Sequence, residues 1–416
     1  MSGGRRFGLR ALVQNGVLTC VSITLVLASA EIALRLLGPA AGGGREDRVV
    51  AQYMGKDPVL GWRKRPNATA VYRRAEYSVE VRVNSLGLRD PERSREAKPG
   101  TLRMLALGDS FVEGYTVALE NTVTQQLEGR LTEASGCPVE VLNGGTAGWS
   151  TDQEYLYYRE EAASFGARIV LLFLYYNDIL ENVRPSYWGR AKPVLEDRDG
   201  RLEIAPRPAG KSGGGERRAG PAAAAANPPS GTSAAPHGSA LYEFVRQRLL
   251  RGQPRLYQRL ASLGVWPPLE PEAPSQEMRV FLAKPEPRLE AAWQHTLRIL
   301  EALAADVTAR GARLVAVYVP AAFEIDDRAW ELTRLAYGMT EPQWRRNAVA
   351  SRLINAGRRR QLAVIDLSHA LREEQRLGAT YFRRDAHWAA RGHAAAAKAV
   401  AAFLRENGYL ACPSLE

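Results

Sequence analysis

The chain has 416 residues, of which 45% are apolar and 24% are charged, a composition typical of a globular protein with one to three domains. These values exclude wholesale disorder and a membrane protein with many spans. The net charge of +11 is compatible with anionic lipids, polysaccharides or nucleic acid, but the basic residues are spread along the whole chain. No zinc-finger, ribonucleoprotein or basic-heptad pattern occurs, so we expect no nucleic-acid partner. The three cysteines, Cys20, Cys137 and Cys412, are too few and too scattered for a disulfide scaffold or a metal site, and no redox or zinc chemistry is expected.

The N-terminus has the pattern of a signal anchor. Arg5, Arg6 and Arg10 precede residues 11–30, which have no charge, and apolar residues continue after Glu31. About 20 such residues span the hydrocarbon thickness as a helix. We expect a cytoplasmic tail over 1–10 and a transmembrane helix over 11–37, which places the remainder outside the cytoplasm at a bacterial inner membrane.

A cleaved secretory signal is the alternative reading of the same segment, because Ala28-Ser29-Ala30 resembles a cleavage site. In that case the protein is secreted. Both readings predict an exported protein, periplasmic or extracellular.

Residues 38–100 are expected to form a small β-containing lead-in that packs on the main domain. The stretch 77–83 alternates polar and apolar residues with the period of a half-buried strand. The lead-in also contains Gly61-Trp62 and Pro66-Asn67.

From Leu102 onward, short apolar runs alternate with amphipathic stretches, which predicts a parallel sheet covered by helices on both faces over residues 101–416. The expected strands are 102–107, 139–142, 169–175, 314–319 and 362–365. The expected helices are 122–132, 151–164, 289–309 and 389–404. Such sheets bind ligands at the carboxyl ends of their strands.

This pattern is interrupted between about 187 and 287. Residues 205–239 consist largely of Ala, Gly, Pro and Ser, and we expect them to be a disordered insertion. The segments 241–263 and 330–353 look helical and are candidates for a cap over the active edge.

The first chemical signal is Gly108-Asp109-Ser110 at the end of the strand 102–107. The glycine permits a tight turn, and the serine then begins a helix or turn whose backbone N–H groups suit an oxyanion. A simple helix cap by Asp109 or Ser110 explains the same residues about equally well.

Two further polar groups follow the next two strands. The glycine loop 143–148 ends at Gly148, and Asn177-Asp178 follows the third strand. Because parallel strands deliver their carboxyl ends to one edge, Gly148 and Asn177 can supply two donors of an oxyanion hole beside the N–H of Ser110. Taken singly, a turn glycine and an Asx turn or helix cap are the simpler explanations.

A general base must come from five histidines. His237 falls in the expected disordered insertion and His295 in the middle of a helix, while His369 could lie near the sheet edge. His387 follows Asp385 by two residues, so the carboxylate can orient the imidazole, and we predict His387 as the base. His393 is expected to be a structural contact, and Asp385 as a helix cap is the simpler alternative.

In their chain order, Gly108-Asp109-Ser110, Gly148, Asn177-Asp178 and Asp385/His387 resemble the four blocks of the SGNH/GDSL hydrolase superfamily. The lead-in, with Gly61-Trp62 and the segment 84–90, resembles that of bacterial membrane-anchored members. The resemblance implies a flavodoxin-like three-layer α/β/α sandwich. It also implies Ser110 as nucleophile, Ser110, Gly148 and Asn177 in the oxyanion hole, and Asp385 and His387 completing the triad.

One departure from the family pattern matters. The family acid usually stands three residues before the histidine, where this chain has Arg384. Asp385-Ala386-His387-Trp388 is instead similar to the Asp-x-His-Trp of SGNH-like proteins that O-acetylate alginate and related exopolysaccharides.

We therefore predict a serine esterase, acting through an acyl-enzyme, that removes O-acyl groups, with acetyl the expected one, from a cell-envelope carbohydrate or lipid. The alternatives are an O-acyltransferase that uses the same residues and a non-catalytic glycan-binding protein. A general lipase or thioesterase fits less well, although Trp149, Phe173, Tyr175 and Tyr176 could line an acyl pocket or fill the core. No metal or organic cofactor is expected.

Overall fold

The computed structural model describes residues 9–37, 49–187, 189–206, 239–264, 266 and 273–413. Most of the expected disordered insertion at 205–239, and most of the tail 1–10, lie outside the described residues. The chain divides into two compact units. The helical unit comprises Met1–Gly42 and Pro229–Glu270, and the sheet unit comprises Gly43–Pro228 and Pro271–Glu416.

The sheet unit is built on five parallel strands in the order β13-β12-β7-β5-β6. Their bounds are β5 Leu102–Leu107, β6 Val139–Asn143, β7 Ile169–Tyr175, β12 Arg313–Val319 and β13 Ala363–Asp366. Numbered along the chain, this is the 2-1-3-4-5 order of flavodoxin-like sheets, whose switch point lies between the first and third strands. The predicted fold class is therefore confirmed.

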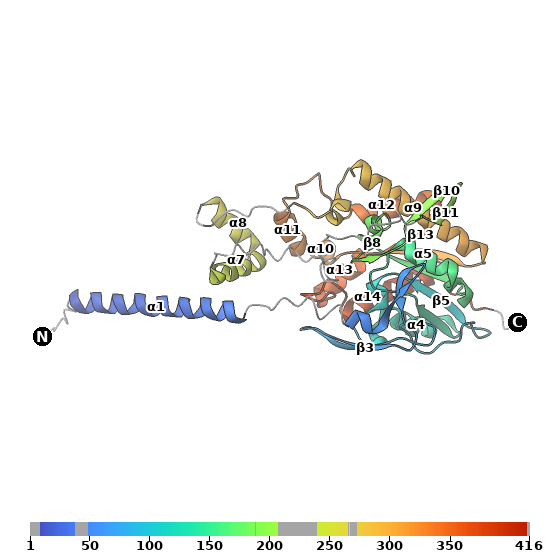
Figure 1. The fold of residues 1–416 in the computed structure, drawn as a ribbon, viewed down its shortest axis with the longest axis horizontal. Coiled ribbons are helices and arrows are strands. Elements are labelled where there is room, and N and C mark those ends of the chain that lie inside the picture. The colour runs from blue at the N-terminus through green and yellow to red at the C-terminus, as the bar shows by residue number, and fades with distance from the viewer. Residues whose placement is uncertain are drawn as a thin grey trace. The chain divides into compact units, whose positions relative to one another are not determined.

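Helices cover both faces of this sheet (Figure 1). On one face α4 packs against α14 and α14 against α13; on the other α9 packs against α5, and α12 lies along β13. Right-handed crossovers explain the division, because the chain moves one way from β5 to β6 and the other way afterwards. The bounds are α4 Val123–Ser135, α5 Thr151–Glu160, α9 Pro287–Ala309, α12 Ala348–Arg360, α13 Ser368–Leu377 and α14 Ala390–Glu406.

Short elements complete the sheet unit. The helical ones are α3 Ser110–Glu113, η1 Leu119–Asn121, η2 Ala162–Phe165, α6 Asp178–Glu181, η4 Glu277–Phe281, α10 Ala322–Ile325 and α11 Asp327–Ala336. The small antiparallel pairs outside the lead-in are β8 Ser186–Tyr187 with β9 Arg190–Ala191, and β10 Leu195–Arg198 with β11 Arg201–Ile204.

The lead-in forms two further hairpins within the sheet unit. Strand β1 (Met54–Asp57) pairs with β2 (Gly61–Lys64), and β3 (Thr69–Arg73) pairs with β4 (Ser78–Arg82). The side chains of β4 alternate between exposed and buried, as the sequence pattern predicts for 77–83.

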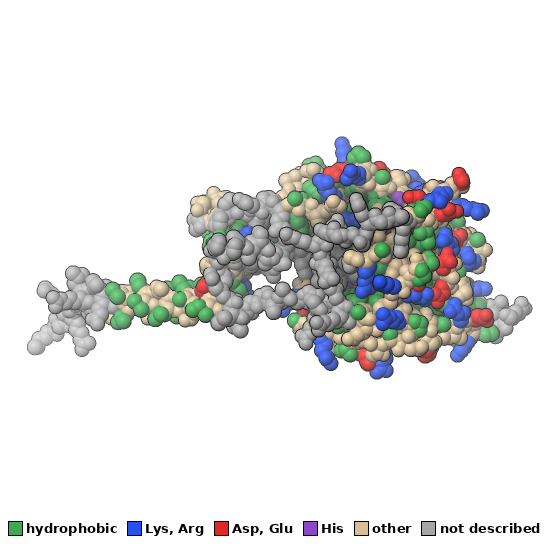
Figure 2. Space-filling view, viewed as in Figure 1, with side chains coloured by type: hydrophobic (Ala, Val, Ile, Leu, Met, Phe, Trp, Pro, Cys, Tyr) green, Lys and Arg blue, Asp and Glu red, His purple; other side chains and the backbone are tan. Residues whose placement is uncertain are grey.

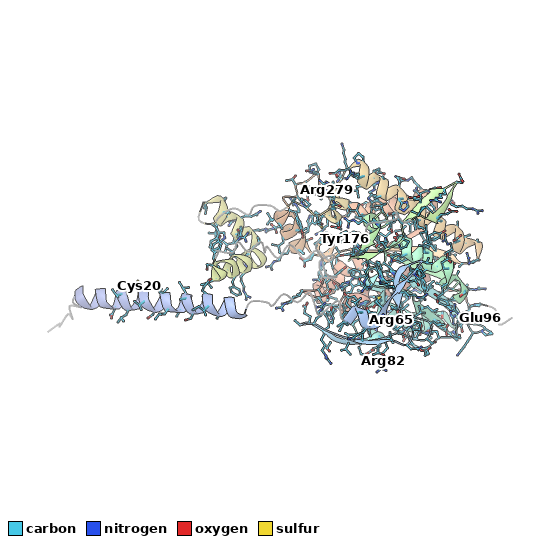
Figure 3. All side chains as sticks on the ribbon, viewed as in Figure 1. Cys20, Arg65, Arg82, Glu96, Tyr176 and Arg279 are labelled. Carbon is cyan, nitrogen blue, oxygen red and sulfur yellow. A yellow bond between two sulfur atoms is a disulfide. The ribbon has the colours of Figure 1, made fainter. Side chains whose placement is uncertain are left out.

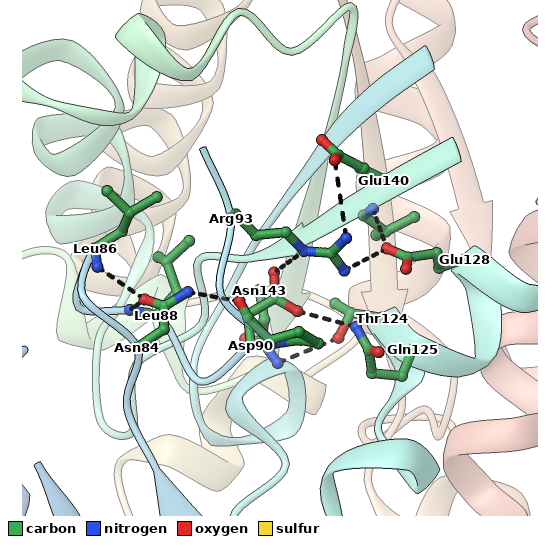
Figure 4. Close-up of polar contacts among 12 residues, drawn as sticks. Asn84, Leu86, Leu88, Asp90, Arg93, Thr124, Gln125, Glu128, Glu140 and Asn143 are labelled. Atoms are coloured by element: carbon green, nitrogen blue, oxygen red, sulfur yellow. Dashed lines mark hydrogen bonds and ion pairs between the residues drawn. The ribbon is translucent and has the colours of Figure 1, made fainter. Parts of the chain in front are cut away.

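The segment 84–90 joins this lead-in to the main sheet (Figure 4). Asn84 Oδ1 accepts from the N–H groups of Leu86 and Leu88 at 3.0 and 2.9 Å, which forms a compact turn. Arg89, fully buried, donates to the carbonyl oxygens of Glu113, Gly114 and Val117 at 2.6 to 2.9 Å. The lead-in is therefore bonded to the residues that end α3.

Two expected helices are each divided in the structure. The segment 241–263 is α7 (Ala240–Gly252) and α8 (Pro254–Ser262), and 330–353 is divided between α11 and α12. Pro254 cannot donate to a preceding turn, and Pro342 follows a cis peptide bond between the second pair. The cap function of these segments stays a prediction.

The helical unit contains α1 (Leu9–Leu37), whose residues Asn15–Ala33 are long and apolar enough to cross a membrane, by length and composition. The visible side chains of α1 are mostly hydrophobic or uncharged, in contrast to the many charged side chains on the visible face of the sheet unit (Figure 2). Cys20 on this helix is exposed (Figure 3).

The other two cysteines form a disulfide, Cys137–Cys412, with 6.0 Å between their Cα atoms. It joins the start of β6 to the chain beyond α14. The sequence reasoning missed this bond, because a pair separated by 275 positions leaves no spacing pattern to read.

Candidate active site

Ser110 lies at the sharp turn between β5 and α3. A Cβ on Gly108 would lie 2.4 Å from the side chain of Val112, so the turn has no room for a larger residue. Asp109 caps α3, because its carboxylate accepts from the N–H of Phe111 at 2.8 Å. The cap by Asp109 and a helix that starts at Ser110 are thus both present, and the two readings of this motif are not exclusive.

His387 joins Ser110 to Asp385. Its Nε2 is 2.8 Å from Ser110 Oγ, although the residues are 277 positions apart in sequence. Its Nδ1 contacts Asp385 Oδ1, and that oxygen also accepts from the backbone N–H of His387 at 3.2 Å. Ser110 and His387 are buried. Burial would raise the pKa of Asp385, but the charge of His387 and hydrogen bonds from His387 and Tyr77 outweigh it and lower that pKa.

The lead-in supplies two contacts to this arrangement that sequence reasoning missed. The hydroxyl of Tyr77, next to β4, donates to Asp385 Oδ2 at 2.7 Å. The carboxylate of Glu76 accepts from the N–H groups of Arg383 and Arg384 at 2.9 and 2.7 Å. Arg384, at the family's usual acid position, is thus held through its backbone. Alternation identified the strand but could not tell which residue its end would touch.

The glycine loop after β6 is held from two sides. On Gly145 a Cβ would lie 2.4 Å from the backbone nitrogen of Glu113, so the loop lies directly on α3. The Glu113 carboxylate accepts from the N–H of Ala147 at 2.6 Å. From the lead-in, Lys64 donates to the Gly145 carbonyl and to Thr146 Oγ1, the latter at 2.9 Å. Burial lowers the pKa of Lys64 to about 8.

The two predicted oxyanion donors flank the serine strand. Gly148 ends its loop with φ of 77°, a conformation that favours glycine. Asn177 follows β7 and begins α6, and its Oδ1 is buried without a hydrogen-bond partner among the described residues. Because β6 and β7 are the two neighbours of β5, the residues that follow these strands, Gly148 and Asn177, lie at the same edge of the sheet as Ser110, at its switch point. Their roles as oxyanion donors stay predictions.

Three buried acids surround this turn. Burial raises the pKa of Asp109 to about 6, and burial and the neighbouring acids raise the pKa of Glu154 and Asp178 well above their usual range. The Asp178 carboxylate accepts from the N–H of Tyr175, three residues earlier, at 3.1 Å, which is a different contact from the Asx turn or helix cap considered for this pair. The raised pKa values show that burial disfavours the charged forms of Glu154 and Asp178, which would keep negative charge away from a developing oxyanion.

The other histidines differ in environment. His393 is buried and its Nδ1 accepts from the N–H of Val123 at 3.1 Å, consistent with a structural contact. Burial lowers its pKa to about 3. His369 is exposed on α13 and His295 is half-buried on α9, while His237 lies outside the described residues.

Aromatic residues near the strand ends belong to the interior. They are all buried in the hydrophobic core: Trp149, Phe173, Tyr175 and Tyr176. Tyr175 packs against Phe111 at 4.8 Å between ring centres. Of the two readings of this group, the structure favours core packing over an acyl pocket. Within the described part of the chain, no group of three or more His, Cys, Asp or Glu side chains is arranged to hold a metal ion.

A serine hydrogen-bonded to a histidine, which is hydrogen-bonded to an aspartate, lies at the switch point of a flavodoxin-like sheet. This arrangement is typical of serine hydrolases and acyltransferases. Residues 279–414 match the family described as the SGNH hydrolase-like domain of the acetyltransferase AlgX. Over these residues the chain is similar to SGNH hydrolase-like enzymes, in agreement with the four sequence blocks and with the 2-1-3-4-5 order of the sheet. The matched residues include Asp385 and His387 and exclude Ser110.

Comparison with solved structures gives remote similarities. A G-D-S-L lipolytic protein from Desulfitobacterium hafniense is 10% identical, with 72% of this chain and 98% of that chain covered and a TM-score of 0.34. Axe2, an acetyl-xylooligosaccharide esterase from Geobacillus, is 11% identical, with coverages of 75% and 97% and a TM-score of 0.37. These values are too low to support an inference about activity. Among curated proteins, none is significantly similar to this chain.

Proposed function

We propose that this protein is an exported, membrane-tethered serine esterase that removes O-acyl groups, chiefly acetyl, from a cell-envelope carbohydrate or lipid. The observation that supports this proposal most directly is that His387 contacts both Ser110 and Asp385 through its two ring nitrogens at the sheet edge. A chain of these three groups is the arrangement that activates a serine hydroxyl.

The proposed reaction has two stages. His387 Nε2 takes the proton of Ser110 as Oγ attacks the ester carbonyl, and the Asp385 carboxylate stabilises the imidazolium. N–H groups at Ser110 and Gly148 and the amide of Asn177 hold the oxyanion. The substrate oxygen leaves with the proton from His387, which produces an acyl-enzyme on Ser110. Water then attacks the acyl carbon while His387 takes its proton. His387 returns this proton to Ser110 Oγ as the bond from Oγ to the acyl carbon breaks, and the carboxylic acid is released.

Transfer to a sugar hydroxyl is the second candidate. The matched family is described by an acetyltransferase, and the match includes the Asp-x-His-Trp segment 385–388. An acceptor hydroxyl in place of water would give transfer from the same acyl-enzyme.

Two observations support export. Residues Asn15–Ala33 can span a membrane behind an arginine-rich start, and the Cys137–Cys412 disulfide suits an oxidising compartment. A lipid-embedded helix would retain the enzyme at the membrane, whereas a cleaved signal would release it.

The test uses the full chain in detergent with a short-chain aryl acetate. A serine-directed phosphonate should abolish turnover and label Ser110, and Ser110→Ala should lower turnover on the order of a million-fold. Labelling of another residue, or full turnover by Ser110→Ala, would refute the proposed nucleophile. Adding an oligosaccharide acceptor then separates the two candidates, because only a transferase yields acetylated sugar in preference to acetate. A purely glycan-binding protein would show no turnover at all.

A further inference from the structure

Helices α7 and α8 have large apolar side chains on their surface. In α7, Phe244 and Val245 are exposed, and Leu256 in α8 and Leu263 just beyond it are exposed as well, Leu263 at 73%. Leu256 and Leu260 are four residues apart in α8 and share one side of the helix, and Leu263, the residue directly after it, continues this spacing. A soluble surface rarely keeps such a stripe uncovered, which indicates a partner for this face.

Glu31 of α1 is hydrogen-bonded to the first residues of α7 and so sets the position along α1 at which α7 begins. Its carboxylate accepts from Ser239 Oγ at 2.8 Å and from the N–H of Leu241 at 2.7 Å, both at the start of α7. Glu31 itself lies in the last turn of the apolar window Asn15–Ala33 of α1. Helices α1 and α7 also contact each other, as Figure 1 shows within this unit. Helix α7 therefore begins at the outer end of the apolar window.

The charge and aromatic content of this segment match a lipid surface. Residues 239–263 contain five arginines and one acidic residue, a net charge of 5 − 1 = +4. The exposed arginines include Arg248, Arg255 and Arg259. Tyr242 stacks on Trp266 with 5.5 Å between ring centres, and such rings concentrate at the boundary between lipid and water. Arginines beside an apolar stripe are typical of helices that lie in that boundary.

We propose that α7 and α8 form an amphipathic hairpin that lies in the outer interface of the membrane spanned by α1, with the leucine stripe among acyl chains and the arginines near anionic headgroups. The inference rests on the proposed membrane anchor. Because the hairpin interrupts the chain of the sheet unit, it adds two covalent connections between that unit and the membrane, beside the one that follows α1.

The experiment uses the full chain with Cys20→Ser, reconstituted in vesicles of phosphatidylcholine and phosphatidylglycerol. Single cysteines are placed by Leu256→Cys and Leu263→Cys on the stripe, and by Gln258→Cys as the matched control on the far side of α8. Spin labels at these sites are tested for collision with oxygen, which enters lipid, and with a nickel complex, which stays in water. Labels at 256 and 263 should lie about 5–10 Å below the headgroup boundary, and the label at 258 should be aqueous.

A further label, placed by Leu25→Cys on α1, separates the two hypotheses. An aqueous label at 25 would refute the anchor, whereas a label at 25 in lipid with aqueous labels at 256 and 263 would refute the hairpin alone. Labels at 256 and 263 shielded from both oxygen and nickel would show that protein covers the stripe, which would also overturn the inference. Changing Arg248, Arg255 and Arg259 to Gln should move the labels toward water by weakening attraction to phosphatidylglycerol.

Discussion

Tyr77 should act on the reaction through Asp385, and Tyr77→Phe isolates that action because it removes only the hydroxyl. The lost hydrogen bond is 2.7 Å long and ends on an ionised, largely buried carboxylate. Hydrogen bonds to charged groups contribute about 1.5–3 kcal/mol. If this entire free energy stabilises the transition state, its loss lowers kcat by roughly tenfold to a hundredfold. Loss of a triad aspartate costs about 10⁴-fold, which sets the upper limit.

The assay compares kcat and KM for an aryl acetate. The ring of Tyr77 and its packing on Phe382, at 5.0 Å between centres, are retained, so KM and the melting temperature should change little. Tyr409→Phe is the matched control, since its ring lies under the Arg313 guanidinium at 3.8 Å and away from the triad contacts.

A double-mutant cycle gives the decisive result. In an Asp385→Ala background the hydroxyl of Tyr77 has no carboxylate to orient, so Tyr77→Phe should then have almost no further effect. An equal loss in both backgrounds would show that Tyr77 acts elsewhere. A change in kcat of less than twofold in the parent would refute the reasoning outright.

Three further outcomes are expected. Gly145→Ala should slow turnover at least tenfold and lower the free energy of unfolding by about 1–3 kcal/mol, because the new Cβ would lie 2.4 Å from the Glu113 nitrogen. The control is Gly129→Ala, whose new Cβ would meet no atom within 4 Å, so this change should leave the free energy of unfolding the same or raise it. Burial raises the pKa of Glu324 to about 8, so the folded state holds a proton there that the unfolded chain releases near 4.5. This contribution to the free energy of unfolding is complete below pH 4.5 and lost as pH rises through about 8, and Glu324→Gln should flatten that part of the pH dependence by a few kcal/mol. Cys412→Ser should lower the free energy of unfolding by about 2–5 kcal/mol in urea titrations.

Each of these has a clear contrary result. Equal stability of the Gly145→Ala and Gly129→Ala variants would contradict the close contact with α3. Unchanged pH dependence in Glu324→Gln would place the titration elsewhere. Equal free energies of unfolding for Cys412→Ser and the parent would show that the Cys137–Cys412 disulfide does not stabilise the fold.

The sheet could be predicted from the sequence because its strands are short apolar runs separated by amphipathic helices. Strands β5 and β7 coincide with the expected 102–107 and 169–175, since every residue in them is buried and all but Arg103 are apolar or aromatic. The order of blocks along the chain also brought Ser110 and His387 together as candidates before any coordinates.

What could not be predicted involves contacts between distant polar residues. Nothing near Tyr77 or Glu76 in sequence indicates a partner some 300 positions away, because hydrogen bonding leaves no periodic pattern. The Cys137–Cys412 bond is hidden for the same reason. The sequence pattern predicts continuous helices at 241–263 and 330–353, whereas α8 begins anew at Pro254 and α11 ends at Ala336.

Because the β3–β4 hairpin contacts the proposed triad, an active fragment of this protein is expected to need residues that precede the main sheet. Judged by its sheet alone, a fragment beginning near residue 101 would contain the proposed nucleophile, base and acid. It would nevertheless lack Tyr77 and Glu76, which contact Asp385 and the backbone of Arg383. It would also lack Lys64 and Arg89, which hydrogen-bond to the glycine loop and to the end of α3. Such a fragment could fold and still turn over poorly, so the smallest competent enzyme is expected to extend back to about residue 49.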